Sequence, residues 1–562
     1  MSALSIFVRL RRSRGDRHER RCSAGALRLS GQGGAVDGAT GALPSLWDTV
    51  VVAAYVPALV LFGAWVSRRQ RHPEDYFLAS RGSRWPAIGL ALLASNISSS
   101  ALVGLAGAAY ATGISVYDYE WSAAVILVFF CVFLLPFVLS SRVYTMPEFL
   151  ERRYDGRARL YFAALTLFLS VTVDAAAALY SGSLVIRVLF PGSPLWVIIV
   201  ALAGAAGLYT VLGGLRAVIY TEAVQGVLIL FGAVVIASAA FSHAGGWHTV
   251  MTSVPPSALS LIRPAGDPGV PWPGLLFGIP VLGFYYWCTN QCIVQRVLSA
   301  RTLEHGRAGA LFAGFLKLPV LFLMVLPGTC AIVLFPHLPR ADLVYPSLVF
   351  RLLPAGLLGL VAASFAAATM ASVASTLNST SALITMDIIR HVAPTLSDRK
   401  VVRIGRLCAA VLLLVAMLWA PQLEHFPSLW QYLQAMLAYA VPPIVALFVV
   451  GLFWRGANVA GARATLLVGT ACGIGLFLAN VVFHRVHLHF LYVAPVLLLI
   501  DAAILIGVSL WSGRPAERVD SVIWTAAYFR AESERLRAVP VWRNYRVQAA
   551  LLLTACVVVA FR

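Results

Sequence analysis

Long apolar runs constrain this chain more than any other feature of its sequence. Runs of 18 or more residues recur along the 562-residue chain, which is 60% hydrophobic and only 12% charged. A bilayer core of about 30 Å is crossed by about 20 apolar residues in a helix, so the sequence predicts a multi-pass membrane protein. The runs are continuous rather than alternating, which is typical of spanning helices.

Fourteen spans are predicted from these runs. They are 47–67, 85–112, 117–140, 160–185, 194–213, 218–241, 272–292, 309–336, 346–387, 404–420, 428–453, 459–482, 487–511 and 546–561. The loops on one side of these spans contain 28 Lys or Arg residues, against six on the other side when residues 1–45 are left out. The basic loops are 68–84, 141–159, 213–218, 291–308, 388–406, 454–464 and 511–546.

The basic loops are predicted to be cytoplasmic, which places both termini outside the cell. The net charge of +19 therefore reflects membrane orientation, and no nucleic-acid partner is predicted. Residues 1–45 contain eight arginines and many Gly, Ser and Ala residues, and we predict a disordered N-terminal extension there.

The stretch Ala366–Asp387 is long enough to cross a membrane, yet twelve of its 22 residues are Ser, Thr, Asn, Met or Asp. Small residues allow close helix packing, and hydroxyl groups supply oxygen ligands inside hydrocarbon. Two interpretations follow, a tightly packed interior helix or an ion site in a transporter core.

Two spans contain polar interruptions. Ala94–Ser100 breaks the second span, and Gly283–Gln291 places aromatic and amide side chains within the seventh. Because these spans are five apart, they fit the discontinuous helices of two inverted repeats, in which freed carbonyl groups bind a cation. The predicted domains are 1–45 (extension), 46–84 (first helix and cytoplasmic loop), 85–241 (inverted repeat 1, spans 2–6), 272–455 (inverted repeat 2, spans 7–11) and 456–562 (spans 12–14, with a cytoplasmic loop at 512–545).

Ionisable residues inside spans are few, and such residues mark functional sites by default. They are Glu120, Asp174, Glu222, Lys317 and Asp501. We expect Glu120 and Lys317 to contact a solute rather than to form only a structural ion pair. Glu222 is either part of an ion route or a helix-start charge. Asp174 either pairs with a polar neighbour or binds a cation, whereas Asp501 lies outside the repeats and is expected to be structural.

Several stretches, in order over residues 75–455, resemble the sodium–solute symporters, nearest to the sodium–glucose cotransporters and bacterial sodium/sugar symporters. The stretches that carry the resemblance are Ala94–Ile97 with Gly104–Gly107, Met146–Leu150, Gly213–Leu215 to Tyr220–Gln225, Tyr286–Gln291 to Gln295–Arg296, and Leu377–Thr380 to Thr385–Asp387. The resemblance implies an all-α, leucine-transporter-like five-plus-five inverted repeat with flanking helices, about 14 transmembrane helices in all.

The resemblance also implies binding sites. The sodium ligands would be the carbonyls of Ala94, Ile97 and Ala368 and the hydroxyl of Ser372, while Ala371 replaces a second hydroxyl, and Glu222 would lie on the ion route. The residues of the implied solute pocket are Asn96, Glu120, Tyr286, Trp287, Lys317 and Gln434. Ala101 and Gly283 replace polar residues of the sugar-transporting relatives, so the pocket suits a sugar, a polyol or another small polar solute.

Together these observations predict secondary active transport in the cell membrane. We expect sodium-coupled symport of a small polar organic solute, a sugar or polyol, by alternating access, with the solute, the sodium ion and the lipid bilayer as partners. A proton-coupled or facilitative carrier of the same fold is one alternative, suggested by Ala371 and Asp174. A transporter-like membrane solute sensor is another. No catalytic constellation or nucleotide motif is present, so an enzyme is not predicted.

Overall fold

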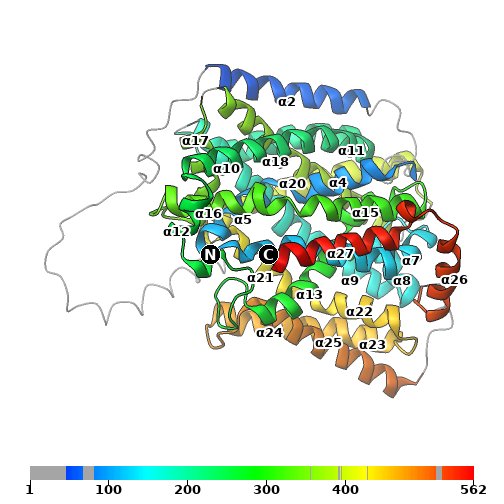
Figure 1. Cartoon of the computed structure of the whole chain (residues 1–562). Helices are drawn as coiled ribbons and strands as arrows, with labels where there is room; N and C mark the ends of the chain where they lie inside the picture. The colour runs from blue at the N-terminus through cyan, green and yellow to red at the C-terminus, as the bar shows by residue number, and fades with distance from the viewer. Residues whose placement is uncertain are drawn as a thin grey trace. The chain divides into compact units, whose positions relative to one another are not determined.

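A computed structural model describes residues 46–66 and 81–561, apart from 191, 355, 390–392, 394, 427 and 514–521. The predicted extension 1–45 and most of loop 68–84 lie outside the described residues. The described part is helical and contains no β-strand (Figure 1). This agrees with the prediction from continuous apolar runs.

The helices of the N-terminal half are α2 (Leu46–Val66), α4 (Trp85–Asn96), α5 (Ser99–Thr112), α6 (Asp118–Phe129), α7 (Leu135–Ser140), α8 (Met146–Arg153), α9 (Gly156–Leu169), α10 (Ala176–Leu189), α11 (Leu195–His243) and α12 (Gly246–Ser253). Those of the C-terminal half are α13 (Ile279–Phe284), α14 (Gln291–Leu298), α15 (Leu303–Lys317), α16 (Leu326–Leu334), α17 (Val344–Leu352), α18 (Leu357–Leu383), α20 (Asp398–Trp419), α21 (Leu429–Ala440), α22 (Pro442–Phe453), α23 (Val459–Ala464), α24 (Thr470–Phe477), α25 (Phe490–Ser512), α26 (Ala526–Arg537) and α27 (Tyr545–Phe561).

Among the described residues, seven helical segments are long and apolar enough to cross a membrane, and up to ten if each bent pair counts as one span. The number 14 stays a prediction. One predicted boundary differs from the structure, because α11 runs as a single 49-residue helix through the loop expected at 213–218. At 1.5 Å per residue α11 is about 73 Å long, more than twice the thickness of a bilayer core. The side chains at the middle of α11 lie outside the described part.

The break predicted in the second span is present as a 57° bend between α4 and α5. Ser98 causes it, because its hydroxyl accepts a hydrogen bond from the Ala101 amide and so caps a new helix. The seventh span is interrupted in the same way. There a π-helical turn, η7 (Tyr285–Thr289), ends at Asn290, whose side chain accepts from the Cys292 amide and caps α14. Polar residues in apolar spans therefore start new helices at these two places.

Helix α18 forms the centre of the structure. Nearly every residue from Leu358 to Leu383 is buried, which agrees with a tightly packed interior helix. Glycines on neighbouring helices allow this approach: a Cβ on Gly182 would lie 2.2 Å from Thr369 Oγ1, and one on Gly232 would lie 2.4 Å from Ser364 Oγ. Small residues thus bring α10 and α11 close to the polar stretch of α18.

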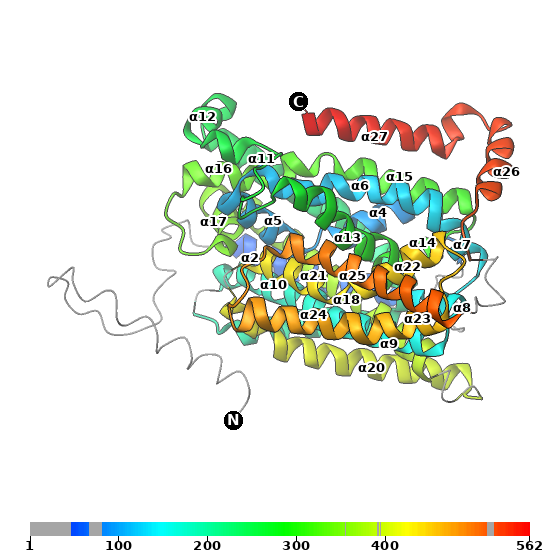
Figure 2. The same cartoon turned by 90° about the horizontal axis from the view of Figure 1, so that it is seen from below.

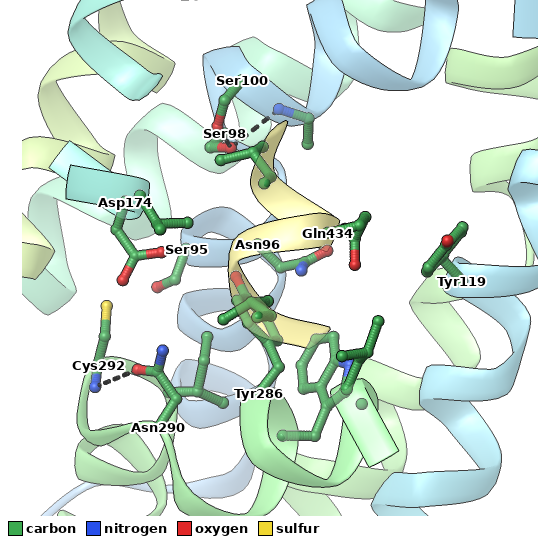
Figure 3. Close-up of a pocket in the computed structure, with 18 of the residues that line it drawn as sticks. Ser95, Asn96, Ser98, Ser100, Tyr119, Asp174, Tyr286, Asn290, Cys292 and Gln434 are labelled. Carbon is green, nitrogen blue, oxygen red and sulfur yellow. Dashed lines mark hydrogen bonds between the residues drawn. The ribbon is translucent and has the colours of Figure 1, made fainter. Parts of the chain in front are cut away.

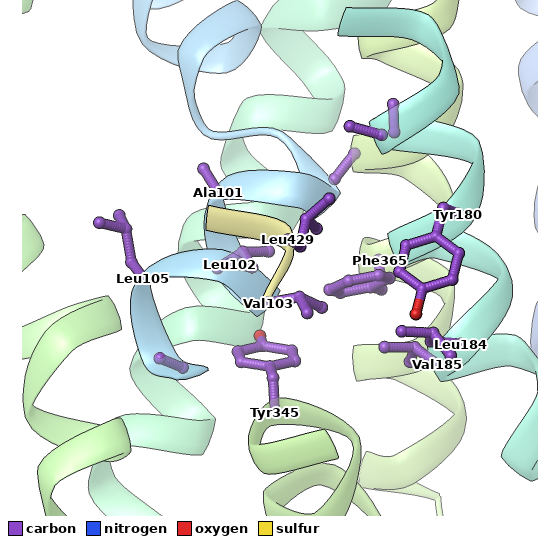
Figure 4. Close-up of a cluster of buried hydrophobic side chains, with 14 of the residues drawn as sticks. Ala101, Leu102, Val103, Leu105, Tyr180, Leu184, Val185, Tyr345, Phe365 and Leu429 are labelled. Atoms are coloured by element: carbon purple, nitrogen blue, oxygen red, sulfur yellow. The ribbon is translucent and has the colours of Figure 1, made fainter. Parts of the chain in front are cut away.

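A hydrophobic cluster packs against α18 at the level of α5. Figure 4 shows Leu102 and Val103 of α5, Leu184 of α10 and Tyr345 of α17 gathered around Phe365 of α18. The rings of Tyr345 and Phe365 lie 5.3 Å apart. This cluster lies next to the α4–α5 break and supports the position of α5.

Several loops predicted to be cytoplasmic lie together at one end of the helices. The amide of Ser83 donates to the Ser299 carbonyl (2.9 Å), and Arg81 donates to the Arg142 carbonyl (2.9 Å). Arg159 pairs with Asp387 at 2.8 Å, which joins α9 to the end of α18. Figures 1 and 2 show α8 and α26 at this end and α12 and α17 at the opposite end. The arrangement is the one expected if basic loops share one side of a membrane.

A charged cluster attaches α26 to the first turns of α15 and the start of α27. Glu532 pairs with Arg307 (2.6 Å) and Arg546 (2.9 Å) and accepts a hydrogen bond from Tyr545 (2.7 Å). Burial alone raises the pKa of Glu532, but the hydrogen bond from Tyr545 and the charge of Arg307 outweigh burial, so this pKa lies below its usual value.

We expect Glu532→Gln to lower the melting temperature of the detergent-purified protein at neutral pH. The loss should correspond to about 1.5–3 kcal/mol, the range for hydrogen bonds to a charged group. Because the pKa of Glu532 is depressed in the folded state, its stabilisation is complete above the unfolded-state value of about 4.3 and is lost as the pH falls further. The difference between parent and variant should therefore shrink in acid. The exposed neighbour Glu534, changed to Gln, is the control and should have no such effect.

Candidate functional site

A cavity lies where the two interrupted spans face α6, α18 and α21. Its volume is about 130 Å³, roughly ten times the 10–15 Å³ that one water molecule needs. Its polar and aromatic lining residues are Ser95, Asn96, Ser98, Ser100, Tyr119, Glu120, Asp174, Tyr286, Trp287, Asn290, Cys292, Ser372, Thr376, Trp430 and Gln434. Figure 3 shows many of these side chains directed toward a common space.

Five of the six residues predicted for a solute pocket line this cavity, and they come from four separate elements. Asn96 ends α4, Glu120 lies in the first turn of α6, Tyr286 and Trp287 lie on the π-helical turn η7, and Gln434 lies on α21. Single π-helical turns are frequent at functional sites because they turn side chains away from the regular helical face. The structure thus brings these five side chains together, while their role in binding stays a prediction.

Lys317, the sixth residue, is not among the cavity-lining residues. It lies at the end of α15, is 1% exposed, and forms an ion pair with Glu120. Its ammonium nitrogen also lies 5.2 Å from the centre of the Trp287 ring, within range of a cation–π interaction. Lys317 therefore contacts two cavity residues from behind and neutralises the charge of Glu120.

Three buried polar atoms of the lining have no hydrogen-bond partner within the described chain. They are Asn96 Oδ1, Tyr119 Oη and Trp430 Nε1. The rings of Tyr119 and Trp430 lie 5.4 Å apart in an edge-to-face pair. Buried polar groups in proteins are nearly always hydrogen-bonded, so unpaired groups around one cavity indicate a polar ligand. One acceptor, one hydroxyl and one N–H donor suit a ligand rich in hydroxyl groups.

The α4–α5 break frees the two carbonyl groups that were predicted to bind sodium. In a continuous helix the Ala94 carbonyl would accept from the Ser98 amide, and the Ile97 carbonyl would accept from the Ala101 amide. Here the Ser98 amide donates to the Asn96 carbonyl (2.8 Å), and the Ala101 amide donates to Ser98 Oγ (3.0 Å). The break therefore has the local chemistry of a cation site.

The other two predicted sodium ligands lie on α18. Ser372 lines the cavity, and its hydroxyl donates to the Ala368 carbonyl at 2.9 Å. This bond uses the hydroxyl hydrogen and leaves oxygen lone pairs for a cation. Ala368 itself is fully buried and does not line the cavity. Ala371 adds no oxygen, so the predicted ligand set contains a single side-chain hydroxyl.

A family model for the sodium:solute symporter family matches residues 76–469 of the chain. The chain belongs to this family. The symporter is 33% identical to sodium/glucose cotransporter 4 of Danio rerio over 544 residues, which cover 87% of this chain and 82% of the relative. It is 36% identical to sodium/myo-inositol cotransporter 2 of Oryctolagus cuniculus over 487 residues (80% and 71% of the two chains). It is 34% identical to a sodium/mannose cotransporter of Bos taurus over 532 residues (85% and 89%).

Solved structures confirm the predicted fold class of this symporter. A Na⁺-coupled sialic acid symporter in a substrate-bound outward-open state has a TM-score of 0.75 at 22% identity, over 84% of this chain and 99% of that chain. The nucleobase-cation-symport-1 transporter Mhp1, in a closed conformation, has a TM-score of 0.54 at 15% identity, over 82% and 99%. The symporter is thus an all-α, leucine-transporter-like membrane protein. Because its family and its relatives are named symporters and cotransporters, it is a transporter and not an enzyme.

Several polar residues of the symporter's cavity lie outside the predicted solute pocket, among them Tyr119 and Trp430 and also the acid Asp174 and the amide Asn290. Asp174 lies on a second π-helical turn, η4 (Ser170–Ala175), and Asn290 caps α14. The sequence does contain a signal for each, because Asp174 is an acid within a span and Asn290 follows an aromatic interruption. Neither signal shows that the two residues face the same space, because that depends on how α9–α10 and α13–α14 are rotated.

Glu222, predicted for an ion route, lies within α11, but its side chain is outside the described part. Its role stays a prediction. Among the described residues, no group of three or more His, Cys, Asp or Glu side chains is placed to hold a metal ion. A sodium site of carbonyl and hydroxyl oxygens does not need such a group.

Proposed function

We infer that this symporter imports a sugar or polyol together with sodium, and that its solute binds in the cavity bounded by α4, α6, η7 and α21. The observation that carries this inference is the set of unpaired polar atoms on Asn96, Tyr119 and Trp430, which line one cavity. The relatives named for glucose, myo-inositol and mannose support the same solute class.

The cavity chemistry suits a polyhydroxylated solute. Carboxylate and amide oxygens accept hydrogen bonds from hydroxyl groups, while amide and indole N–H groups donate to them. The Tyr286 and Trp287 rings, 5.3 Å apart, offer apolar surface for the C–H face of a sugar ring. Glu120 keeps its acceptor oxygens in place because Lys317 holds the carboxylate from outside the cavity.

Coupling requires that sodium and solute favour the same conformation. Sodium bound at Ala94, Ile97, Ala368 and Ser372 would join the α4–α5 break to α18. A ligand shifts a conformational equilibrium only through different affinities for the two states, so sodium must bind the outward-open state more tightly than the inward-open state. Ser372 lines the same cavity as Asn96, which places one proposed sodium ligand next to the proposed solute site. Tyr286 is the proposed inner gate.

The direct test is uptake of labelled sugars and polyols by purified protein in liposomes. Glucose, mannose, galactose and myo-inositol form the first panel, each measured with external sodium and with external choline. At least one member should be taken up faster in sodium than in choline. Equal uptake of every member in both salts, or no uptake above protein-free liposomes, contradicts the proposal.

Gln434→Ala should weaken solute binding by about 3- to 10-fold, the effect of losing one ordinary hydrogen bond. The melting temperature should not change, because Gln434 faces the cavity and its side chain forms no hydrogen bond with the described residues. Binding is measured by tryptophan fluorescence, since Trp287 and Trp430 line the cavity. Gln431→Ala, on the exposed face of the same helix, is the matched control. Equal effects of the two substitutions on solute binding would show that Gln434 is not part of the solute site.

A further inference from the structure

Asp174 is the second carboxylate of the cavity, and its environment differs from that of Glu120. Glu120 is neutralised by Lys317. Within the described residues no lysine or arginine forms an ion pair with Asp174. Burial and a hydrogen bond with Asn290 act on its carboxylate, and no neighbouring charge of the described part does. The carboxylate nevertheless lines the cavity and is partly accessible from it. The cavity therefore contains one carboxylate without a counter-charge from the protein.

An unpaired carboxylate inside a membrane protein is costly and normally pairs with a cation. The candidates are a positively charged group on the solute, a second metal ion and a proton. Each candidate makes a different prediction for the removal of the charge at position 174. The polar groups around Asp174 distinguish between the first two, and the comparison of solutes below excludes or identifies the proton, because a protonated Asp174 gives no preference for an amino group.

The groups beside Asp174 are a poor cage for a bare metal ion. Asn290 lies close enough to interact with Asp174, but its side-chain oxygen already accepts from the Cys292 amide at 2.8 Å. Asn290 presents its NH₂ to Asp174, and this donor cannot ligate a metal ion. The nearby hydroxyl of Ser95 donates to the Ala91 carbonyl at 2.6 Å and keeps its oxygen lone pairs, so Ser95 supplies one oxygen ligand to a cation beside Asp174. A dehydrated metal ion needs a complete set of oxygen ligands. An ammonium group needs only a few acceptors, because the rest of its molecule is covalently attached.

The position of Asp174 also suits one end of an elongated solute. In Figure 3 Asp174 and Ser95 lie on one side of Asn96, whereas Gln434 and Tyr119 lie on the other. A molecule that spans the cavity would therefore meet a carboxylate at one end and neutral hydrogen-bonding groups at the other. Tyr286, between the two ends, presents an aromatic ring that tolerates a nearby cation.

We propose that Asp174 forms a subsite for a cationic group, so that the preferred solute of this symporter is an amino sugar or amino polyol. Asp174 binds the ammonium group, and Asn96, Tyr119 and Gln434 bind hydroxyl groups of the same molecule. This inference rests on the proposed function and narrows its solute class. It assigns to Asp174 a role in solute specificity.

The test compares matched pairs of solutes that differ only by an amino group. Glucose and glucosamine, galactose and galactosamine, and mannose and mannosamine are titrated by tryptophan fluorescence and by competition for sodium-driven uptake. The pH is kept low enough for the amine to be charged. In at least one pair the amino member should bind at least about tenfold more tightly, because hydrogen bonds between charged groups are stronger than those between neutral groups.

Asp174→Asn should abolish this preference, because a neutral amide does not pair with an ammonium group. Asp174→Glu, which keeps the charge, should retain part of the preference. Asp501→Asn is the matched control, since Asp501 is a buried carboxylate in α25 that does not line the cavity. It should leave the preference unchanged.

Three results would overturn the proposal. The first is that the parent binds the two members of every pair equally. The second is that Asp174→Asn weakens the binding of both members of a pair to the same extent. The third is that Asp174→Asn changes sodium affinity while the preference for the amino member is retained. The last result assigns Asp174 to a second metal ion. In each of these cases the parent still takes up neutral sugars in a sodium-dependent manner, whereas failure of the proposed function removes sodium-driven uptake by the parent altogether.

Discussion

Ser372→Ala should raise the sodium concentration for half-maximal uptake more than about tenfold and leave little uptake at physiological sodium. Ser372 supplies the single side-chain hydroxyl of the proposed sodium site, because Ala371 has none. Loss of one interaction with a charged ligand costs about 1.5–3 kcal/mol, or roughly 10- to 150-fold in affinity. The reverse change, Ala371→Ser, adds an oxygen and should lower the sodium concentration for half-maximal uptake.

The matched control for Ser372 is Ser364→Ala. Ser364 is buried on the same helix, and its hydroxyl donates to the Val361 carbonyl at 2.7 Å, but it does not line the cavity. Its removal should change stability slightly and leave sodium dependence unaltered. If Ser372→Ala and Ser364→Ala have the same effect on sodium dependence, Ser372 is a packing residue and the proposed sodium site is wrong.

Glu120→Gln should produce the second large effect, a loss of both stability and transport. The substitution leaves the ammonium of Lys317 buried without its carboxylate, and breaking a buried ion pair costs about 3–5 kcal/mol. The double variant Glu120→Gln/Lys317→Met removes both charges and should recover most of the stability. It should not recover transport, because Glu120 faces the cavity and accepts hydrogen bonds from the solute in our account.

The single and double variants separate the structural role of the Glu120–Lys317 ion pair from the role of Glu120 in transport. Thermal unfolding in detergent measures stability, and uptake in liposomes measures transport. Recovery of transport in the double variant would show that the pair is only structural. The partly exposed pair Arg463–Asp155 (2.6 Å) serves as a control, because Arg463→Gln removes an ion pair that is worth little and should change neither property.

The sequence predicts the fold well where the local chemistry is unambiguous. Continuous apolar runs predict spanning helices, and the polar stretches Ala94–Ser100 and Gly283–Gln291 predict two breaks. In the structure Ser98 and Asn290 cap the new helices at these breaks. Long-range features are harder to predict. The continuity of α11 through 213–218 is not encoded by any local signal, because Gly213 and Gly214 are equally compatible with a loop.

The candidate site is also predictable only in part, because local motifs identify residues but not how their helices are rotated. Asn96, Glu120, Tyr286, Trp287 and Gln434 were named through resemblance, and they do surround one cavity. Lys317 lies behind Glu120 rather than in the cavity, and this position depends on the rotation of α15. The accessibility of Asp174 likewise depends on the π-helical turn η4, which no sequence pattern predicts.

The most direct test of the central claim is whether a sodium gradient drives solute accumulation. Liposomes containing the purified symporter are loaded with labelled solute at equal concentration inside and outside, and an inward sodium gradient is then imposed. Sodium-coupled symport predicts that the solute accumulates inside, that reversing the gradient depletes it, and that a proton gradient alone does neither. Accumulation driven by protons with no response to sodium would contradict the account and favour a proton-coupled carrier. No net movement under either gradient, with exchange still measurable, would identify a facilitative carrier.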